Sequence, residues 1–414
     1  ETCIKSQEEN KAIEYVERSK AGTLIELIAS LNLSPKNIID DEIREQLNEL
    51  QRDIAEERTN ISKTSDLETI DYSNLFSLRQ KLDSVIAKHI LPIEPSFSLQ
   101  MRKKSIKLES IKELISDRYT AIIEWYITDE NIYTFIITKD KLELLELNDL
   151  KQAFEYCKEL YKVTYQQQIE DEKNEWQDNL KTHLEKLAEV LNIRKIIEKI
   201  PNCRKLILIP HGFLHTIPLH ALILDYKEGS YLIDRFMEGI SYAPSCQLLQ
   251  LTKEWQRENF HNLFAVQNPS TDLNYSDQEV EMIKKYFDKS DIYQKENATK
   301  DSICKTEANK LEEAHCVHFS CHSNFNFDSP LDSALTLADG KLNLQEILKL
   351  NLKQCRLVTL SACETGLIDD ESSTDEYVSL SSAFLYAGSP SVVASLWKVN
   401  DFSSALLMIK FYEY

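Results

Sequence analysis

Two short sequences in the C-terminal half of the chain combine the residue types of a cysteine hydrolase. Residues 318–323 are His-Phe-Ser-Cys-His-Ser, and residues 360–366 are Leu-Ser-Ala-Cys-Glu-Thr-Gly. A thiol attacks a carbonyl carbon as a thiolate, and an adjacent imidazole can take up the thiol proton and later donate it to a leaving group. The two sequences therefore predict Cys363 as the nucleophile and His322 as the acid and base.

Each of the two sequences closes a short apolar run. The runs at 316–319 and 356–360 are typical of strands buried in a parallel sheet. Open α/β sheets place their chemistry just outside the carboxyl ends of such strands. The segment between His322 and Cys363 has room for one loop, one short helix and one strand, so a right-handed crossover would make the two strands neighbours. Both side chains would then lie over one crevice.

Cys363 also has a purely structural interpretation, because free cysteines are commonly buried in protein cores. Its context favours catalysis: the small residues Ser361 and Ala362 precede it, and Gly366 permits a tight turn after the strand. A thiol at a strand end, beside backbone N–H groups, can ionise and attack a carbonyl. Spacing alone leaves both interpretations open.

Three histidines compete for the role of base. His315 and His318 lie within the predicted strand, where we expect them to be packed or hydrogen-bonded. Strand alternation places His318 and His322 on one face if the strand extends that far. His322 stands at the strand end, and the segment 323–326 after it, with its serine and two asparagines, is typical of a loop. We therefore assign the catalytic role to His322.

Acidic residues near the predicted nucleophile could select a substrate. Asp401 precedes a helical pattern and is well suited to be its N-cap, which is the interpretation that the sequence favours. Its carboxylate could instead bind a basic side chain, above all an arginine. The acidic run 369–376 follows Cys363 and is typical of a solvated loop, but it could also steer a basic substrate or act as an activation loop.

Composition limits the class of protein. The 414 residues carry a net charge of −20 and 42% hydrophobic residues, which predicts two or three domains with ample core. Such an acidic chain is unsuited to phosphate contacts, so we expect basic partners and no direct nucleic-acid binding. The sequence contains no signal peptide and no apolar run long enough to span a bilayer, which predicts a cytoplasmic protein. Because the first residue is Glu1, we expect the chain to be a fragment.

The nine cysteines predict neither disulfides nor a metal site. They are scattered, odd in number and form no C-x-x-C pair, which is typical of a reduced cytosolic protein. Histidines and cysteines crowd together at 315–322, but alternate side chains of a strand face opposite ways, which disfavours a metal cage. No glycine-rich phosphate loop is present either. We expect no metal and no organic cofactor.

The elements that position the predicted site change in character along the chain. Only one of the seven glycines precedes residue 200, and Glu/Lys/Leu-rich sequence with helical spacing fills most of the first half. We predict helices within 7–32, 66–91, 101–117 and 149–198. A β-rich patch with a hairpin signal interrupts them, with strands at 121–127, 132–137 and 142–147.

From residue 203 onwards, strands and helices alternate, which predicts a parallel sheet with helices on both faces. The predicted strands are 205–209, 262–266, 315–320, 356–361 and 391–396. The predicted helices are 276–287, 300–312, 343–350 and 376–387, and another starts at Asp401.

Taken in order, several segments resemble the CHAT family, which are caspase-like peptidases often joined to tetratricopeptide repeats and related to separase. The matching segments, besides those around His322 and Cys363, are 206–212, 240–245, 264–269, 330–335, 383–388 and 392–397. The resemblance covers roughly residues 116–414, and the helices at 1–35 look like the final repeat of an array.

The resemblance implies an α/β fold of caspase-like type. Its open, mostly parallel sheet would be flanked by helices and preceded by a repeat-like helical region and a small β-rich segment. We accordingly predict three regions: a helical region at 1–115, an accessory segment at 116–202 and a protease core at 203–414.

The resemblance also implies roles for single residues. The catalytic histidine of the family falls on His322 and its cysteine on Cys363. Backbone N–H groups of Cys363 and Ser323 are expected to hold the oxyanion, although Ser323 stands where the family usually has glycine. By similarity to separase, Asp401 falls where an acidic residue recognises a basic P1 side chain, and Glu364 is a second candidate for substrate binding.

The resulting hypothesis is a cytosolic cysteine endopeptidase that cleaves a protein substrate after Arg or Lys. A regulatory protein or the substrate would bind the N-terminal helices and control the site. One alternative is a catalytically inactive caspase-like interaction or scaffold module, since a fold does not guarantee activity. The other is a Cys/His acyl hydrolase or transferase that acts on small molecules.

Overall fold

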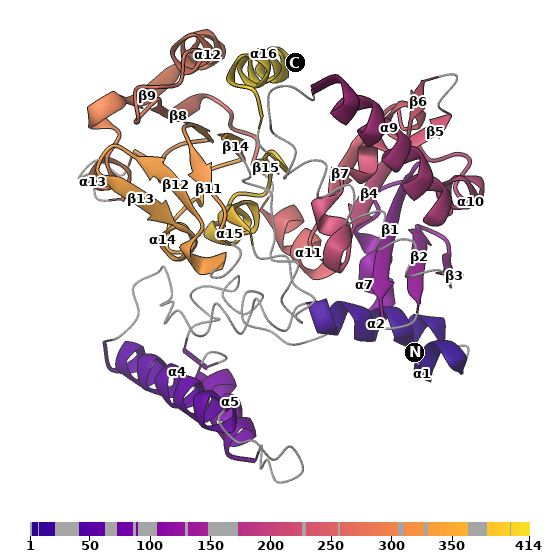
Figure 1. Cartoon of the computed structure of the whole chain (residues 1–414). Helices are drawn as coiled ribbons and strands as arrows, with labels where there is room; N and C mark the ends of the chain where they lie inside the picture. The colour runs from indigo at the N-terminus through magenta and orange to yellow at the C-terminus, as the bar shows by residue number, and fades with distance from the viewer. Residues whose placement is uncertain are drawn as a thin grey trace. The chain divides into compact units, whose positions relative to one another are not determined.

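Tertiary contacts divide the chain into two units, which we describe separately. The larger unit comprises Glu1–Lys20 and Ser105–Tyr414, and the smaller comprises Ala21–Lys104. The structure is a computed structural model (Figure 1). It describes residues 2–6, 8–20, 41–62, 73–85, 88–89, 106–128, 131–147, 173–225, 229–255, 257–304, 310–326, 330–362, 379–397 and 399–414. Within these residues, no helix combines the length and the apolar content needed to cross a membrane.

The first sheet of the larger unit is mixed, with five strands in the order β3-β2-β1-β4-β7. Their bounds are Thr120–Ile127 (β1), Ile132–Thr138 (β2), Leu142–Leu147 (β3), Lys205–Ile209 (β4) and Ile240–Tyr242 (β7). Strand β2 pairs antiparallel with β1 and β3, whereas β4 pairs parallel with β1 and β7. The predicted hairpin and third strand are confirmed.

Helices cover both faces of this mixed sheet, which explains why β1 and β2 are apolar along most of their length. Ile123 shares one core with Leu187 and Ile196, and Ile122 shares another with Ile13 and Ile111. The bounds of the covering helices are Glu9–Lys20 (α2), Leu108–Glu113 (α7), Lys173–Val190 (α9), Ile193–Lys199 (α10) and Cys246–Glu254 (α11). A short helix, Thr2–Lys5 (α1), precedes them.

The second sheet of the larger unit is parallel, with strands in the order β15-β14-β10-β8-β9. Their bounds are Asn262–Gln267 (β8), Lys289–Gln294 (β9), Cys316–Ser320 (β10), Leu357–Ser361 (β14) and Val392–Val393 (β15). Strand β10 lies in the middle, and all five of its residues are buried. The burial of β10 therefore explains why its sequence is apolar, as the sequence analysis predicted.

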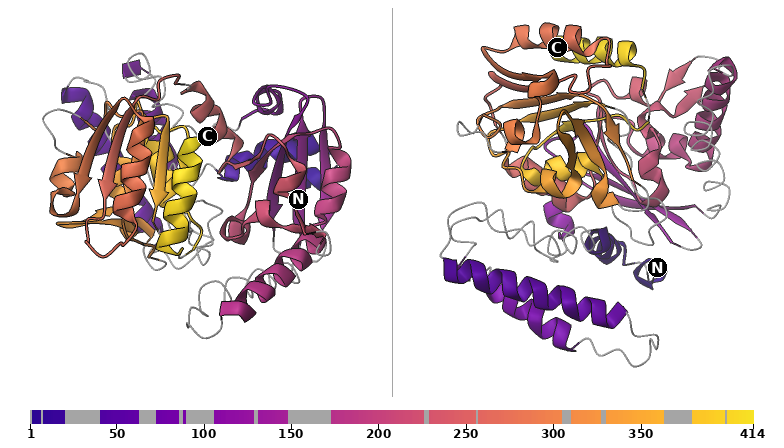
Figure 2. Two further views of the ribbon diagram at one scale, coloured as in Figure 1. Left: turned by 90° about the horizontal axis from the view of Figure 1, so that it is seen from above. Right: turned by 60° about the vertical axis from the view of Figure 1, so that its left-hand side comes forward.

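Both faces of β10 are covered by helices. On one face, Cys316 shares a core with Val280 and Met408, which belong to helices α12 and α16 that lie side by side (Figures 1 and 2). On the other face, the ring of Phe319 lies 5.4 Å from that of Phe384 in α15. The bounds of the helices are Ser276–Ile283 (α12), Lys300–Cys304 (α13), Leu344–Leu348 (α14), Leu380–Ala387 (α15) and Asp401–Glu413 (α16).

Smaller elements complete the larger unit. A three-stranded antiparallel sheet follows β10 and consists of Ser323–Asn324 (β11), Ala334–Leu337 (β12) and Gly340–Asn343 (β13). A two-stranded sheet consists of Ile223–Asp225 (β5) and Ser230–Tyr231 (β6). Short 3₁₀ helices occur at Gly212–Thr216, Leu219–Ala221, Ile233–Arg235, Lys284–Tyr286, Lys295–Asn297 and Pro330–Asp332.

The described part of the smaller unit contains two longer helices, α4 (Asp41–Ser62) and α5 (Ser73–Val85). They pack against each other through apolar side chains that recur at helical spacing: Leu47, Leu50, Ile54, Leu82 and Val85. The predicted helix at 66–91 is thus confirmed over 73–85. The similarity of this region to tetratricopeptide repeats stays a prediction.

The sequence predicted the positions of the strands better than it predicted which strands share a sheet. The five strands expected after residue 203 are all present, but 205–209 was expected in the same parallel sheet as 315–320, and this is wrong. It forms β4 of the mixed sheet and pairs with β1. An apolar run indicates that a strand is buried on both faces but does not specify its neighbour. Parts of the predicted helices at 7–32, 149–198, 300–312 and 376–387 lie outside the described residues.

Candidate catalytic site

The strands that precede the two predicted catalytic residues are neighbours. β10 and β14 pair in parallel, with Ser320 as the partner of Ser361, so the expectation that these two strands are neighbours is confirmed. His322 comes two residues after Ser320, and Cys363 comes two residues after Ser361 in the sequence. Cys363 and Glu364 lie outside the described residues, as does the acidic run 369–376.

His322 is paired with a carboxylate that the sequence analysis did not identify. Its Nε2 lies 2.9 Å from Oδ1 and 3.0 Å from Oδ2 of Asp272. The exposed fractions of the two side chains are 42% and 62%. Because the N–H at Nε2 donates to the carboxylate, the neutral imidazole carries its lone pair on Nδ1. His322 can therefore accept a proton on the side that faces away from Asp272.

Asp272 belongs to a loop, residues 268–275, that connects β8 to α12. The side chain of Asn268 closes this loop, since its Nδ2 donates to the carbonyl of Leu273 (2.9 Å) and its Oδ1 accepts from the N–H of Leu273 (3.1 Å). The N–H of Asn268 donates to the carbonyl of Ser320 (2.9 Å). The loop is thereby attached to the end of the strand that leads to His322.

A hydroxyl group inside the loop stabilises the charged form of Asp272. Ser270 Oγ donates to Asp272 Oδ1 at 2.5 Å. This hydrogen bond, and then the hydrogen bond from His322, lower the pKa of the Asp272 carboxyl below its usual value, while partial burial opposes the shift. Asp272 is therefore ionised at neutral pH and can pair with a protonated His322.

The residues directly after His322 differ from the expectation. The segment 323–326 was predicted to be a loop, but Ser323–Asn324 forms β11, which pairs with β12. The carbonyl of His322 accepts from the N–H of Thr336 in β12 (2.8 Å). Short polar strands have no apolar pattern, so the sequence does not reveal them. The assignment of the Ser323 N–H to an oxyanion site stays a prediction.

His318 has a structural role, as the sequence suggested. It is fully buried, its Nδ1 lies 2.7 Å from Thr359 Oγ1, and its Nε2 lies 3.4 Å from Glu279 Oε1. Ser320 Oγ donates to Glu279 Oε2 (2.8 Å). Tyr412 of α16 contacts the same network, with its hydroxyl 2.5 Å from Thr359 Oγ1. These contacts fix β10 and β14 beneath the site.

His315 is likewise hydrogen-bonded in the sheet region. Its Nδ1 accepts from the backbone N–H groups of His261 (3.1 Å) and Asn262 (3.3 Å). The prediction that the first two histidines of the cluster are structural is confirmed for both.

Asp401 is bound to the loop that carries Asp272. Its Oδ2 accepts from the N–H of Tyr275 at 3.1 Å, and the ring of Tyr275 lies 4.9 Å from that of Phe402. The N-cap of α16 is Asn400, whose Oδ1 accepts from the N–H of Ser403, so the prediction that Asp401 is the cap is wrong by one residue. Asn and Asp are similarly favourable caps, and the pattern alone does not separate neighbours.

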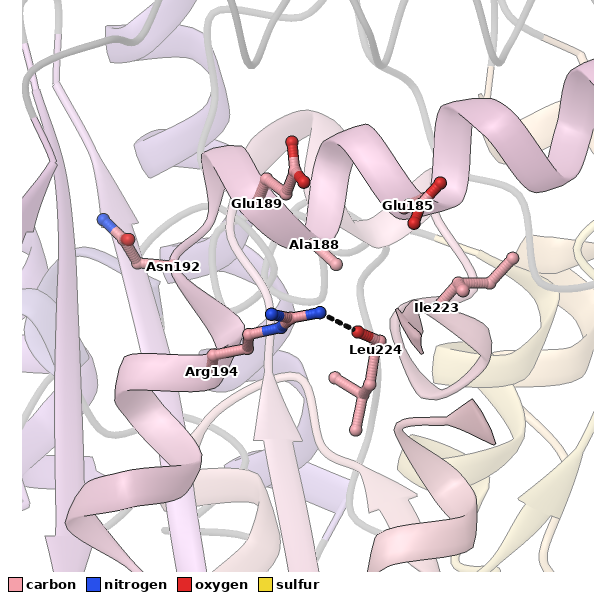
Figure 3. Close-up of a pocket in the computed structure, with 7 residues that line it drawn as sticks. All are labelled: Glu185, Ala188, Glu189, Asn192, Arg194, Ile223 and Leu224. Atoms are coloured by element: carbon pink, nitrogen blue, oxygen red, sulfur yellow. Dashed lines mark hydrogen bonds between the residues drawn. The ribbon is translucent and has the colours of Figure 1, made fainter. Parts of the chain in front are cut away.

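Among the described residues of the larger unit, two other places resemble binding sites and contain no predicted catalytic residue. A surface pocket of about 230 Å³ is lined by Glu185, Ala188, Glu189, Asn192, Arg194, Ile223 and Leu224, and the guanidinium of Arg194 donates across it to the carbonyl of Leu224 (Figure 3).

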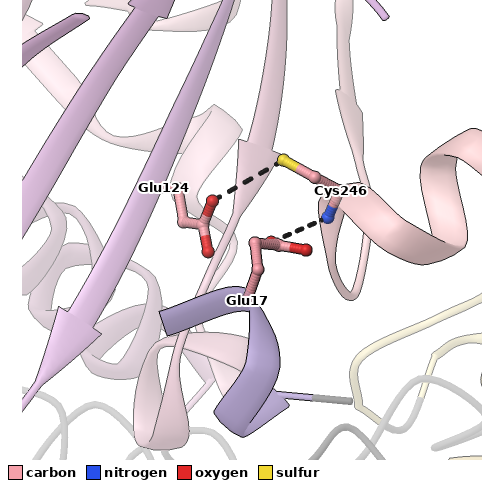
Figure 4. Close-up of side chains that lie close together, drawn as sticks. All are labelled: Glu17, Glu124 and Cys246. Atoms are coloured by element: carbon pink, nitrogen blue, oxygen red, sulfur yellow. Dashed lines mark hydrogen bonds between the residues drawn. The ribbon is translucent and has the colours of Figure 1, made fainter. Parts of the chain in front are cut away.

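The second place is a buried cluster of Glu17, Glu124 and Cys246 whose side-chain atoms lie within 4.8 Å of one another (Figure 4). Such a set could ligate a cation. However, the ammonium of Lys20 already lies 3.0 Å from Glu124 Oε1. The carboxylate of Glu17 accepts from the N–H groups of Cys246 (2.9 Å) and Gln247 (3.0 Å). The cluster is therefore a buried ion network.

Comparison with known proteins assigns the chain to a family. The model of the CHAT domain matches residues 156–414. No curated protein matches the sequence. The matched range includes the whole parallel sheet, Asp272, His322 and Cys363. Because it covers more than half of the chain, this protein belongs to the CHAT domain family, whose members are caspase-like.

Proposed function

We propose that this protein is a cysteine endopeptidase in which Cys363 is the nucleophile and His322 is the acid and base. The observation that carries the proposal is that His322 comes just after β10 and that the strand paired with β10, β14, leads to Cys363 within two residues. The pairing of Nε2 with Asp272 supports the role of His322, because it presents Nδ1 as the basic nitrogen.

The proposed reaction has two stages. His322 Nδ1 accepts the proton of the Cys363 thiol, and the thiolate attacks the scissile carbonyl carbon. The imidazolium then donates its proton to the leaving amine, which gives an acyl-enzyme. In the second stage, His322 takes a proton from a water molecule, the resulting hydroxide attacks the thioester, and the thiol is regenerated. The N–H groups of Cys363 and Ser323 would stabilise the oxyanion in both stages.

The substrate of this peptidase would carry Arg or Lys at P1. Asp401 supports this choice, because its carboxylate accepts a hydrogen bond from the loop that carries Asp272, the partner of His322. Glu364, next to the nucleophile, would be a second acidic contact. A net charge of −20 also favours basic peptides during encounter. The helical N-terminal region, or a partner bound to it, would regulate the activity.

The test is digestion of a mixed peptide library, read by mass spectrometry, with the parent protein and its Cys363→Ala and His322→Ala variants. We expect cleavage after Arg or Lys in the parent. Each variant should lose at least about a thousandfold in rate, and the double variant little more, because the two residues act as a unit. Cys304→Ala is the matched control, since this thiol is exposed and belongs to α13, which contributes no residue to the proposed site.

Other outcomes would contradict the proposal in distinct ways. Cleavage that persists in Cys363→Ala would show that another group or a contaminant is responsible. Hydrolysis of small esters without cleavage of peptides would favour an acyl hydrolase. No turnover of either, even with the helical region occupied by its partner, would favour a catalytically inactive interaction module.

A further inference from the structure

We propose that Asp272 is a positioning residue of the active site, which orients the His322 ring and stabilises its protonated form during turnover. The inference rests on the proposed function. It assigns a third member to the catalytic group and gives a role to the loop 268–275.

The His322 ring is held by hydrogen bonds to Asp272. The ring is 42% exposed, so packing alone leaves it free to rotate. Within the described residues, the ring forms its hydrogen bonds with Asp272. An imidazole in water exchanges between two tautomers, and a carboxylate that accepts from Nε2–H selects the one with a basic Nδ1. Asp272 thus determines both the orientation and the basic nitrogen of His322.

The Asp272 side chain is in turn held by Ser270, and its loop is held at both ends. Ser270 Oγ donates to Oδ1 of Asp272. Asn268 closes the loop on Leu273 and donates its N–H to the carbonyl of Ser320. At the other end, the N–H of Tyr275 is bound by Asp401 of α16, as described above. A group held in this way requires little reorganisation when charge develops next to it.

The pair of Asp272 and His322 contributes little to the stability of the fold. Both members of the pair are substantially exposed, and exposed ion pairs contribute little to stability because water screens them. The backbone also adopts positive φ at Asn268 (45°) and Thr271 (67°), a conformation that non-glycine residues rarely adopt. The loop thus has unfavourable torsions and carries an ion pair that stabilises the fold little. Function at the site explains these torsions better than the stability of the fold does.

The chemical role follows from the proton transfers. When Nδ1 takes the thiol proton, the ring becomes an imidazolium, and the ionised Asp272 carboxylate next to Nε2 lowers the free energy of that cation. The carboxylate does not take up the proton itself. It favours the thiolate–imidazolium pair over the neutral pair. The thiolate–imidazolium pair is the state that attacks the substrate.

The test uses Asp272→Asn, which preserves the shape and an acceptor oxygen but removes the charge. The alkaline limb of kcat/KM against pH, where the imidazolium loses its proton, should move to lower pH by roughly half a unit or more. Asp272→Glu, which keeps the charge, should retain the parent profile. The matched control is Asp288→Asn, because Asp288 forms a similar exposed pair with His261 (3.1 Å) away from the site.

A second readout does not require peptidase activity. The rate at which iodoacetamide alkylates Cys363 is followed against pH by peptide mass spectrometry in the same variants. We expect Asp272→Asn to slow this reaction by roughly threefold or more near pH 6 and to leave it unchanged near pH 10, where the thiol is ionised without help. Asp288→Asn should match the parent at every pH.

The two readouts separate the possible failures. If Asp272→Asn leaves both the pH profile and the alkylation rate unchanged, the positioning role is refuted while the peptidase assignment stands. If peptides are not cleaved but alkylation of Cys363 depends on Asp272, the peptidase assignment fails and the pairing stands. A uniform fall in activity at all pH values, with no shift of the alkaline limb, would reduce Asp272 to a structural residue and overturn the proposal.

Discussion

At the scale of single residues, burial determines which thiols can react. Burial raises the pKa of Cys355 to about 11 and that of Cys321 to about 12, and it raises the pKa of Cys246 well above its usual value. These thiols are therefore protonated at neutral pH and screened from reagents. Cys304, in contrast, is exposed.

This contrast predicts a selective alkylation pattern. A short treatment of the native protein with iodoacetamide at pH 7 should modify Cys363 first and Cys304 more slowly, because a thiolate paired with an imidazolium reacts faster than an ordinary thiol. Cys321 and Cys355 should react only after unfolding. Quantitative peptide mass spectrometry before and after urea provides the measurement. If Cys355 were labelled as fast as Cys304, the conclusion that burial protects the Cys355 thiol would be wrong.

Asp401 allows a test of substrate selection at a single residue. In Asp401→Asn, the amide oxygen can still accept from the N–H of Tyr275, so the loop is preserved while the charge is lost. We expect kcat/KM for peptides with Arg at P1 to fall at least about tenfold, mostly through KM, because the charge-assisted contact is missing. Asp288→Asn is the control. An equal fall for substrates with an uncharged P1 residue would contradict a role in selection.

Part of the candidate site could be proposed from the sequence. A histidine and a cysteine after two apolar runs stand out because the run, the strand end and the residue are contiguous. Asp272 could not be assigned, since its pairing with His322 depends on β8 lying next to β10, which only the strand order reveals. The available signal was an acidic residue in the loop after a predicted strand, and such residues are common.

At the scale of elements, helix α2 shows what periodicity can and cannot predict. The expected apolar face is confirmed, because Ile13 and Val16 are both buried. However, Glu17 and Lys20 on the same helix are buried too, although charged residues are normally assigned to solvent. Their partners are Glu124 of β1 and the first N–H groups of α11. Local sequence carries no information on such distant partners.

This network predicts an unequal cost for two lysine substitutions in α2. Lys20→Met would leave Glu17 and Glu124 buried without a cation, and the free energy of unfolding should fall by about 3–5 kcal/mol. Lys11→Met removes an exposed pair with Glu8, which water screens, and should leave the free energy of unfolding nearly unchanged. Urea denaturation measures both. The double variant with Glu124→Gln should regain part of the loss, and absence of that recovery would contradict direct coupling.

The same cluster predicts a pH dependence. Burial, and then the neighbouring Glu124, raise the pKa of Glu17 well above its usual value in the folded protein. The folded state therefore holds a proton that the unfolded state has lost, so this contribution to stability is present at pH 4.5 and declines as pH rises towards the folded pKa. Replacing Glu17 by Gln should flatten the profile above pH 4.5. An unchanged slope would show that Glu17 titrates normally.

At the scale of the whole molecule, charge is the property with the clearest kinetic consequence. The net charge of −20 should accelerate encounter with basic peptides, and salt should suppress this effect. Between roughly 0.05 M and 0.5 M salt we expect kcat/KM for a peptide with several basic residues to fall several-fold, with kcat unchanged. A peptide whose single Arg lies at P1 is the control. Equal salt dependence for both would contradict long-range attraction.

The grouping of strands into two sheets belongs to this scale as well. The mixed sheet takes β1 to β3 from the segment before residue 150 and β4 and β7 from the segment after residue 200. The sequence predicted every one of these apolar runs except the short β7. It did not reveal that β4 completes a sheet with the hairpin, because strand pairing over such distances depends on the packing of the helices between them.

The shared hydrogen-bond ladder of β10 and β14 also restricts how such proteins can diverge. Ser320 and Ser361 are partners, and a spacer of one residue separates each of them from His322 or Cys363, so the equal spacers set the positions of the two proposed catalytic residues along the strands. One residue inserted in either spacer would move one group along by about 3.3 Å and reverse the direction of its side chain. Insertions in the crossover between the strands have neither effect. Related proteins that keep the activity should therefore vary in the length of the crossover but not in the length of either spacer.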